Sequence, residues 1–209
     1  MESKTNLRLA IFFFLSLGSV SCTAQPPAIV GGGCEGCEAI YEYGQKPLNA
    51  TDTLPGFKSN EPKLKITGTV YKRDGKTPAG NVILYIYHTN RKGVYEKRGD
   101  EKGWARRHGF RRGWIKTGPD GRYTFYTFKP AAYPDGTEPA HIHITVKEPD
   151  KNEYYLDSYF FADDPLLSPQ LRGKLTNRGG SGIMTLQEEN EMLLVQRNII
   201  LGQNIPDYE

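Results

Sequence analysis

Hydrophobic and polar positions alternate along much of the chain from about residue 63 onwards, which is the pattern of strands. In the stretch "LKITGTVY", Leu64, Ile66 and Val70 share one face, because successive side chains of a strand point to opposite sides. Runs rich in β-branched and aromatic residues follow, namely "NVILYIYHT", "AHIHITV" and "YYLDSYFF". Short strands separated by turn signals predict an all-β domain built as an antiparallel β-sandwich.

Three further stretches complete the predicted organisation. The sequence "GWIKTGPDGRYTFYTF" predicts a β-hairpin, with two β-rich runs around the turn at residues 118–121. Near the C-terminus, "DPLLSPQLRGKL" can hold a turn or two of helix. The later half of "LQEENEMLLVQRNIIL" is β-branched, which favours a final strand.

The first 21 residues have the features of a targeting segment. Lys4 and Arg8 precede a short apolar run over residues 9–17, which is too short to span a bilayer comfortably and is followed by the small residues of "LGSVSC". This pattern predicts a signal peptide over 1–21, cleavage before Cys22, and a lipid anchor on that cysteine as the protein's contact with the membrane. The alternative is ordinary secretion with cleavage a few residues later. Either way, we expect an exported protein.

The next segment, residues 22–33, contains Pro and Gly without periodicity and predicts a flexible tether, which leaves 34–209 as a single domain. Cys34 and Cys37 form a CxxC motif at the start of this domain. Such a motif can be a redox centre, half of a zinc site or a local disulfide. The chain has no second CxxC motif, and export favours the disulfide.

Charge adds one local feature. The net charge is only +3, so nothing in the overall balance points to a nucleic-acid partner. Between Arg91 and Lys116, however, there are ten Lys or Arg residues against three acidic ones. This basic segment is either a solvated loop or the source of an electrostatic field that attracts an anionic ligand.

Candidate metal chemistry begins with "EPAHIHITV", in which His141 and His143 point to the same side of a strand. The two histidines alone are also compatible with the solvated face of a sheet. Tyr133 lies eight residues before His141, and Tyr95 follows a glycine turn. A phenol has a pKa near ~10, so only a strongly Lewis-acidic ion binds it as tyrosinate at neutral pH. Ferric iron is the natural candidate.

From about Leu64 to Pro165 the sequence resembles the intradiol ring-cleavage dioxygenases, the family of protocatechuate 3,4-dioxygenase and catechol 1,2-dioxygenase. The resemblance is carried, in order, by "ITGTVYKRDGKTPAGNVILYIYHTNRKGVY", "GWIKTGPDGRYTFYTFKPAAYP", "PAHIHITV" and "YFFADDP". It implies a β-sandwich whose long loops carry an Fe(III) site. The positions that match the family's iron ligands are Tyr95, Tyr133, His141 and His143.

The resemblance also implies a reaction. O2 would open the ring of a catechol-type aromatic diol between its two hydroxyl-bearing carbons, giving a muconate-type diacid. Tyr133 would be the ligand that the substrate displaces and the acceptor of a substrate proton. The resemblance leaves a homo-oligomer open, although the helical dimerisation region of the catechol enzymes has no counterpart in the sequence.

One departure from the family bears on activity. Glu138 stands where relatives commonly have an arginine that stabilises charge on the substrate. Losing one such group typically costs ~10²–10³ in rate. Either an arginine from 106–112 substitutes, or the substrate differs, or the activity is weak. The alternative to an enzyme is therefore a silent β-sandwich that binds ferric iron or a ferric catecholate without turnover.

The other aromatic and imidazole side chains near these positions are expected to have supporting roles. His88 is expected to support the site rather than bind the metal. His108 is expected to be exposed, with contact to the substrate as the alternative. The remaining aromatic residues are expected to pack in the core or at its rim: Trp104, Trp114, Tyr85 and Tyr87.

Overall fold

The structure of the protein, a computed structural model, describes residues 29–209. The predicted signal peptide, the cleavage and lipid attachment at Cys22, and most of the predicted tether lie outside the described residues. Between residues 29 and 209, no helix is long and apolar enough to cross a membrane.

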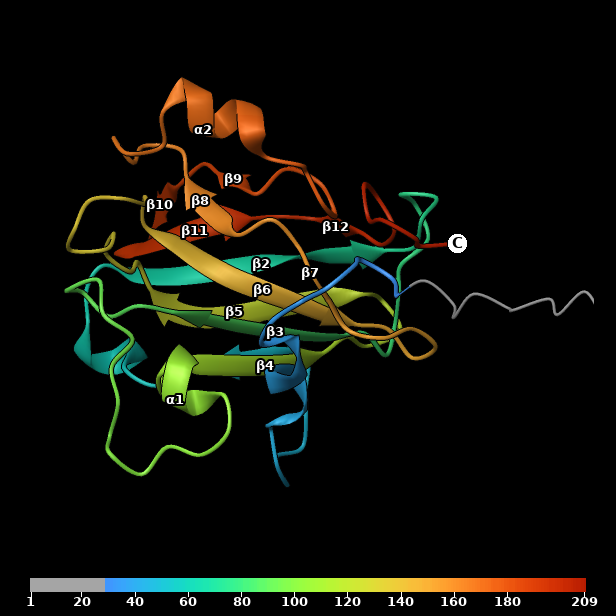
Figure 1. Ribbon diagram of the computed structural model, residues 1–209, viewed down its shortest axis with the longest axis horizontal. Coiled ribbons are helices and arrows are strands. Elements are labelled where there is room, and N and C mark those ends of the chain that lie inside the picture. Colours follow the sequence, from blue (N-terminus) through green and yellow to red (C-terminus); the bar gives the residue numbers. More distant parts are fainter. Residues whose placement is uncertain (1–28) are drawn as a thin grey trace, which may run out of the picture.

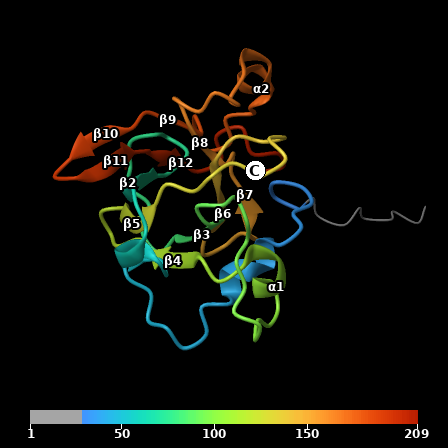
Figure 2. The same cartoon turned by 90° about the vertical axis from the view of Figure 1, so that its left-hand side faces the viewer.

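Two six-stranded sheets face each other as the layers of a sandwich (Figures 1 and 2). In the first sheet the strand order is β1 (Thr51–Thr53), β5 (Arg122–Phe128), β2 (Lys63–Tyr71), β11 (Met192–Gln196) and β10 (Gln187–Glu189), with β12 (Ile199–Ile200) also on β2. In the second the order is β4 (Arg112–Lys116), β3 (Ile83–His88), β6 (His141–Lys147), β8 (Tyr159–Phe161) and β9 (Ile183–Met184), with β7 (Tyr154–Tyr155) also on β6. The all-β sandwich is confirmed.

Alternation along the strands places the core between the two sheets. On β2, Leu64, Ile66 and Val70 are fully buried, as the pattern of that strand predicts. On β6, Ile142, Ile144 and Val146 belong to the same hydrophobic cluster. Removing such side chains from water is the main force that holds the sheets together, roughly 25 cal/mol per Å² of apolar surface. The odd-numbered residues of β6, including both histidines, are therefore turned to the opposite face of this sheet.

The sandwich is less uniformly antiparallel than predicted. The long pairings β2–β5, β3–β4 and β3–β6 are antiparallel, but β1–β5, β11–β2, β12–β2 and β8–β9 are parallel. Each of the parallel pairings involves a short strand. In each parallel pairing the two partner strands are separated by more than 20 residues of chain, so the later strand can join its partner in either direction.

The predicted hairpin around residues 118–121 is wrong in its pairing. The turn is present, because Gly121 donates its backbone N–H to Gly118, but β4 and β5 lie in different sheets. β4 pairs with β3, and β5 pairs with β2. A turn signal encodes a change of direction and not the partner of each strand. The chain here crosses from one layer of the sandwich to the other.

The C-terminal predictions are confirmed. The expected helix is α2 (Pro169–Lys174), whose N-cap Ser168 accepts the backbone N–H of Leu171. The expected final strand appears as two short strands, β11 and β12, and β10 precedes them. Three other short helical elements are α1 (Ala105–His108), η1 (Cys37–Tyr41) and η2 (Phe57–Ser59).

The start of the packed domain differs from the prediction. Val30 is buried in the main core cluster, and the backbone N–H of Gly31 bonds to the carbonyl of Pro206. The last residues of the predicted tether are therefore docked on the sandwich. The Cys34–Cys37 disulfide is present, as expected, and leads directly into η1.

Candidate metal centre

The four predicted ligands come from three places in the fold and meet on the outer face of the second sheet. His141 and His143 lie on β6, which is held between β3 and β8. Tyr95 lies in the loop that follows β3, and Tyr133 lies in the loop between β5 and β6. The hydrogen-bonded ladder fixes the histidines, while the two loops carry the phenols to them.

The donor atoms of these residues form a continuous cluster. The hydroxyl of Tyr95 lies 2.8 Å from the hydroxyl of Tyr133 and 2.8 Å from Nε2 of His143. Nε2 of His143 lies 3.0 Å from Nε2 of His141. The structure thus brings together all four residues that the family resemblance selects. That they bind a metal stays a prediction.

The tautomer of His141 suits metal binding. Its Nδ1 lies 2.8 Å from the carbonyl oxygen of Pro139. A carbonyl oxygen only accepts hydrogen bonds, so Nδ1 carries the proton and Nε2 presents a lone pair to the cluster. Nδ1 of His143 is held more loosely, 3.4 Å from Oγ of Ser158. A backbone or side-chain partner at the outer nitrogen is the usual support of a histidine ligand.

Protonation in the metal-free protein is set mainly by burial. Burial, with the nearby imidazoles of His141 and His108, holds the pKa of His143 well below its usual range. Burial also raises the pKa of Tyr95 and that of Tyr133. Both phenols are therefore neutral at pH 7 without a metal, and only a highly charged cation can make them ligate as tyrosinates.

The donor set suits ferric iron, and it differs from common metal sites in containing neither a carboxylate nor a thiolate. Within residues 29–209, no group of three or more His, Cys, Asp and Glu residues could hold a metal ion. Two neutral imidazoles and two phenols that become anionic on binding would neutralise most of the charge of Fe(III), and phenolate is a hard ligand that this ion favours. The residues present therefore fit the metal that the family resemblance implies.

Glu138 lies beside this cluster. Its Oε2 is 3.8 Å from Nε2 of His141, and 55% of its side chain is exposed. The carboxylate contributes to raising the pKa of both tyrosines. The residue that stands in place of the family's arginine thus adds negative charge next to the four donors.

The arginines of residues 106–112 do not leave a free cation at the site. Three of them are paired with carboxylates: Arg107 with Glu35, Arg111 with Glu96 and Arg112 with Glu42. Arg106 bonds through Nε to a backbone carbonyl in its own loop. Of these four, only Arg107 lines the cavity that also contains Tyr95, Tyr133 and His143.

A stack of rings supports the second histidine. Tyr87 of β3 lies parallel to His143, with ring centroids 4.4 Å apart, and His108 lies 3.7 Å beyond Tyr87. Nδ1 of His108 is 2.8 Å from the hydroxyl of Tyr85. The expectation that His108 is exposed is wrong: it is buried, with Trp104 on its other side. Flanking arginines give its segment a polar appearance, while the ring itself turns inward.

The residue that the sequence reasoning undervalued is Tyr87. It was expected only to pack, yet it stacks on a predicted ligand and lines the cavity at the site. Its partner in the β3–β6 register is His143, so correct strand pairing would have revealed this role. Trp114 does pack as predicted, and its Nε1 donates to the carbonyl of Ala39.

His88, as predicted, supports the structure. Its Nδ1 donates to the carbonyl of Thr89 at 2.7 Å, and its Nε2 accepts from the hydroxyl of Thr127 at 2.6 Å. Both ring nitrogens are satisfied away from the four donors. Burial lowers the pKa of His88 to about 4, so the ring is neutral at pH 7.

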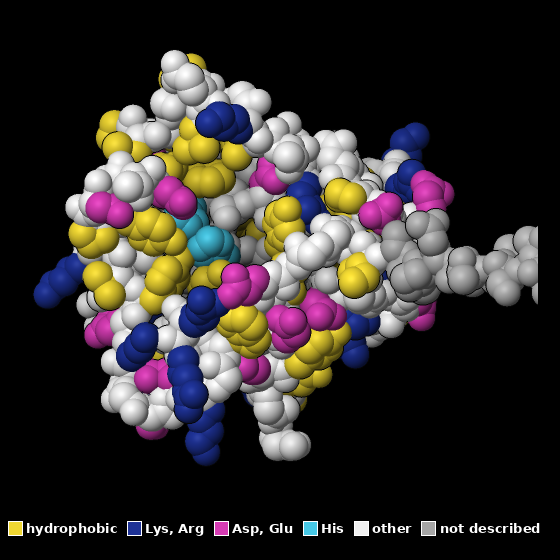
Figure 3. Space-filling model, in the orientation of Figure 1, with side chains coloured by type: hydrophobic (Ala, Val, Ile, Leu, Met, Phe, Trp, Pro, Cys, Tyr) yellow, Lys and Arg dark blue, Asp and Glu magenta, His cyan; other side chains and the backbone are white. Residues whose placement is uncertain are grey.

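The site opens to the surface through a cavity of about 260 Å³. Figure 3 shows histidine side chains within a hollow of this face, bordered by hydrophobic side chains. A cavity with aromatic walls and a few polar groups at its base suits a small aromatic molecule.

Comparison with known proteins identifies the family of the chain. A family model described as "Dioxygenase" matches residues 43–178, well over half of the chain. The protocatechuate 3,4-dioxygenase beta chain of Burkholderia cepacia is 30% identical over 138 residues, which are 60% of this chain and 58% of that protein. Catechol 1,2-dioxygenase 1 of Acinetobacter lwoffii is 34% identical over 120 residues, 50% of this chain and 37% of that protein. The chain belongs to the intradiol ring-cleavage dioxygenase family.

Solved structures show the same fold. The dioxygenase domain of a dioxygenase carbohydrate-binding protein fusion from Streptomyces sp. SirexAA-E has a TM-score of 0.53 and 22% identity, and the match covers 76% of this chain and 90% of that one. Catechol 1,2-dioxygenase of Acinetobacter radioresistens has a TM-score of 0.54 and 16% identity, over 78% of this chain and 60% of that one. Among the curated relatives, the match spans 58% of the length of the protocatechuate dioxygenase chain and 37% of the length of the catechol dioxygenase.

Proposed function

We propose that the protein is a non-haem iron(III)-dependent intradiol dioxygenase, which opens a catechol-type ring with O2 to a muconate-type diacid. The observation that supports this most strongly is the convergence of four donors, linked in a continuous chain by three contacts of 2.8–3.0 Å and contributed by Tyr133, Tyr95, His143 and His141. They converge in a chain whose relatives include proteins named protocatechuate and catechol dioxygenases.

When bound, ferric iron would act as a Lewis acid that holds the two catechol oxygens and makes the ring reactive towards O2. The protein's own residues would do the rest. Tyr95 is fixed between Tyr133 and His143 by two hydrogen bonds. Tyr133 lies at the start of an exposed loop, and among the described residues Tyr95 is the only hydrogen-bond partner of its hydroxyl group. Tyr133 is therefore the phenol best placed to move aside and accept a proton from the substrate.

A specific observation favours the alternative, a protein that binds ferric iron or a ferric catecholate without turnover. Glu138 is next to the donors, and Arg107, the one arginine of 106–112 that lines the cavity, is paired with Glu35. No fixed cation of that group is then free to stabilise charge developing on the substrate.

Export and the anchor at Cys22 are also proposals. The Cys34–Cys37 disulfide supports export, because such bonds form and persist in oxidising compartments. The apolar run after Arg8 supports them independently.

Enzyme and binder are distinguished by product formation. Residues 23–209, loaded with iron, should consume O2 and convert catechol to muconate if the protein is an enzyme. Tyr133→Phe should keep the metal through the other three donors and lose most of the rate, because the proton acceptor is gone. Binding of catechol without any O2 consumption would favour the binder. Glu138→Arg, which restores a cation, should then make O2 consumption measurable.

A further inference from the structure

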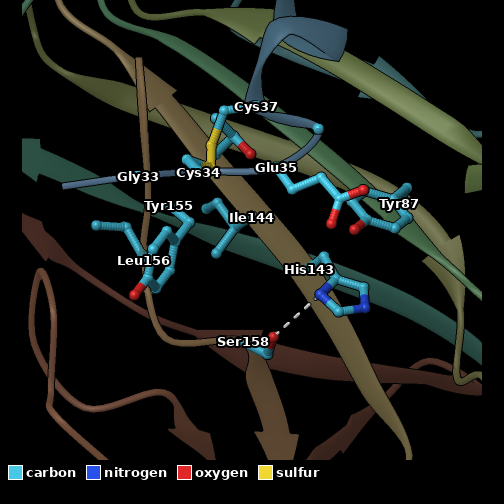
Figure 4. Close-up of a pocket in the computed structure, with 12 residues that line it drawn as sticks. Gly33, Cys34, Glu35, Cys37, Tyr87, His143, Ile144, Tyr155, Leu156 and Ser158 are labelled. Carbon is cyan, nitrogen blue, oxygen red and sulfur yellow. Dashed lines mark hydrogen bonds between the residues drawn. A yellow bond between two sulfur atoms is a disulfide. The ribbon is translucent and has the colours of Figure 1, made fainter. Parts of the chain in front are cut away.

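A second cavity adjoins the one at the four donors. It has a volume of about 310 Å³ and shares Glu35, Tyr87 and His143 with the first cavity (Figure 4). Because three residues line both, the two cavities adjoin at these side chains, which is where a substituent on a molecule held at the donors would enter the second cavity. At ~30 Å³ per water molecule, the second cavity has room for several heavy atoms.

One wall of this second cavity is the N-terminal disulfide loop, residues 33–37. The loop is held on three sides. The disulfide closes it, Gly31 before it is bonded to Pro206, and η1 after it accepts the indole N–H of Trp114. At Gly36, where φ is +87°, a Cβ would stand 2.9 Å from the His108 ring, so the loop lies directly against the stack that supports His143. This wall is part of the folded site.

The opposite wall and floor are uncharged. They consist of Ile144 and Thr145 from β6, Tyr155 at the end of β7, and Leu156 and Ser158 from the segment between β7 and β8. These side chains offer apolar contact and hydroxyl groups. The only charged residue that lines the second cavity is Glu35.

Glu35 also forms an ion pair with an arginine of the first cavity. Its carboxylate pairs with Arg107, which lines the first cavity. A carboxylate on a substrate would compete with Glu35 for Arg107 and would be repelled by Glu35 at the second cavity, a screened effect because the side chains of Glu35 and Arg107 are 73% and 64% exposed. An uncharged substituent meets neither obstacle, so the charge pattern selects against anions.

We propose that the second cavity is a substituent subsite: it binds an extended, uncharged group on the catechol ring and disfavours a carboxylate at that place. The proposal rests on the proposed function and names its substrate class. The substrates expected are catechols with a chain of several heavy atoms that ends in a hydroxyl or remains apolar.

The test measures binding, not turnover. Ferric protein, purified as the cell exports it, is titrated without O2, and the shift of its visible band gives Kd for three diols. These are catechol, 4-(3-hydroxypropyl)catechol and 3-(3,4-dihydroxyphenyl)propanoate, of which the last two are an alcohol and an acid of equal length. The alcohol should bind at least about fivefold more tightly than catechol and than the acid, a ratio that about 1 kcal/mol produces.

Variants locate the effect. Gly33 lines the second cavity, and a Cβ there meets no atom within 4 Å, so Gly33→Leu should fill the space and remove the advantage of the alcohol over catechol. Tyr155→Ala removes part of the opposite wall and should reduce the same ratio. Gly173→Leu is the matched control, because it adds an identical side chain into open space in α2. Glu35→Gln should bring the Kd of the acid to within about twofold of the Kd of the alcohol. Thermal unfolding checks that each variant is folded.

The possible results separate the two proposals. If catechol shifts the band but the alcohol binds no more tightly, or if Gly33→Leu and Tyr155→Ala both keep the alcohol's advantage, the subsite is overturned and the proposed function stands. If iron binds and none of the three diols shifts the band, the proposed function fails and the subsite fails with it.

Discussion

Neutralising Glu138 should weaken the binding of ferric iron by a predictable amount. A ferric ion with two tyrosinate ligands would carry a net charge of about +1. The Glu138 carboxylate lies 3.8 Å from Nε2 of His141, the atom that would bind the ion, and this distance is taken as the scale of the charge separation. Two unit charges about 4 Å apart attract each other by about 1 kcal/mol in water and about 4 kcal/mol at the dielectric typical of a protein surface. Because 55% of the side chain is exposed, solvent screens the pair and the lower value applies. Glu138→Gln is therefore expected to raise the Kd for iron about fivefold.

The assay is competition between the protein and a soluble chelator, with the iron-bound fraction read from the tyrosinate charge-transfer band. The difference between wild type and Glu138→Gln should shrink as ionic strength rises, since an exposed charge is screened by salt. Glu188→Gln is the matched control, because Glu188 is an exposed carboxylate on β10, in the other sheet. An unchanged Kd for Glu138→Gln at low salt, or an equal change in Glu188→Gln, would refute the electrostatic reasoning.

Three further predictions concern stability. Because burial lowers the pKa of His88 from 6.5 to about 4, the unfolded chain binds a proton in this pH range that the folded chain does not, and stability falls as the pH drops. Urea unfolding measures how much the free energy of unfolding falls between pH 7 and pH 5. This fall should be about 2 kcal/mol larger in wild type than in His88→Gln, and equal falls would show that His88 does not titrate this way. Gly68→Ala should destabilise by about 2–3 kcal/mol, because a Cβ on β2 would overlap the carbonyl of Arg197, and an unchanged melting temperature would contradict this packing. Cys34→Ser should cost about 2 kcal/mol, the closure entropy of a short loop, and wild type with a reducing agent should lose the same amount.

Local patterns in the sequence predicted local structure well. Alternation of apolar and polar positions identified the strand that became β2, because a strand with one face on the core must place its apolar residues two apart. Runs of β-branched and aromatic residues identified the strands that became β3 and β6. The short helix at Pro169–Lys174 followed from its own residues in the same way. These features depend on neighbours in the chain and not on distant partners.

Features that depend on distant partners were harder to predict. The turn at residues 118–121 does not show that β4 joins β3 while β5 joins β2. Nor do the arginines around His108 show that its ring inserts between Tyr87 and Trp104. Both errors have one cause: which strands pair and which rings stack is decided by packing between segments far apart in the sequence.

The candidate site shows the same division. The shared face of His141 and His143 follows from the period of a strand. Their approach to Tyr95 and Tyr133 does not, because Tyr95 is 38 residues from Tyr133 and 48 from His143. The family resemblance supplied that connection, and the structure brings the four side chains together.

Metal content and the visible spectrum test the proposed centre most directly. Residues 23–209 should bind one ferric ion per chain and show a tyrosinate charge-transfer band that shifts when catechol is added. Tyr95→Phe should weaken both the band and the retention of iron, whereas Tyr43→Phe, a change in a tyrosine packed near Trp114 and away from the four donors, should alter neither. A colourless protein that takes up no iron after ferric reconstitution would contradict the assignment of Tyr95, Tyr133, His141 and His143 as ligands.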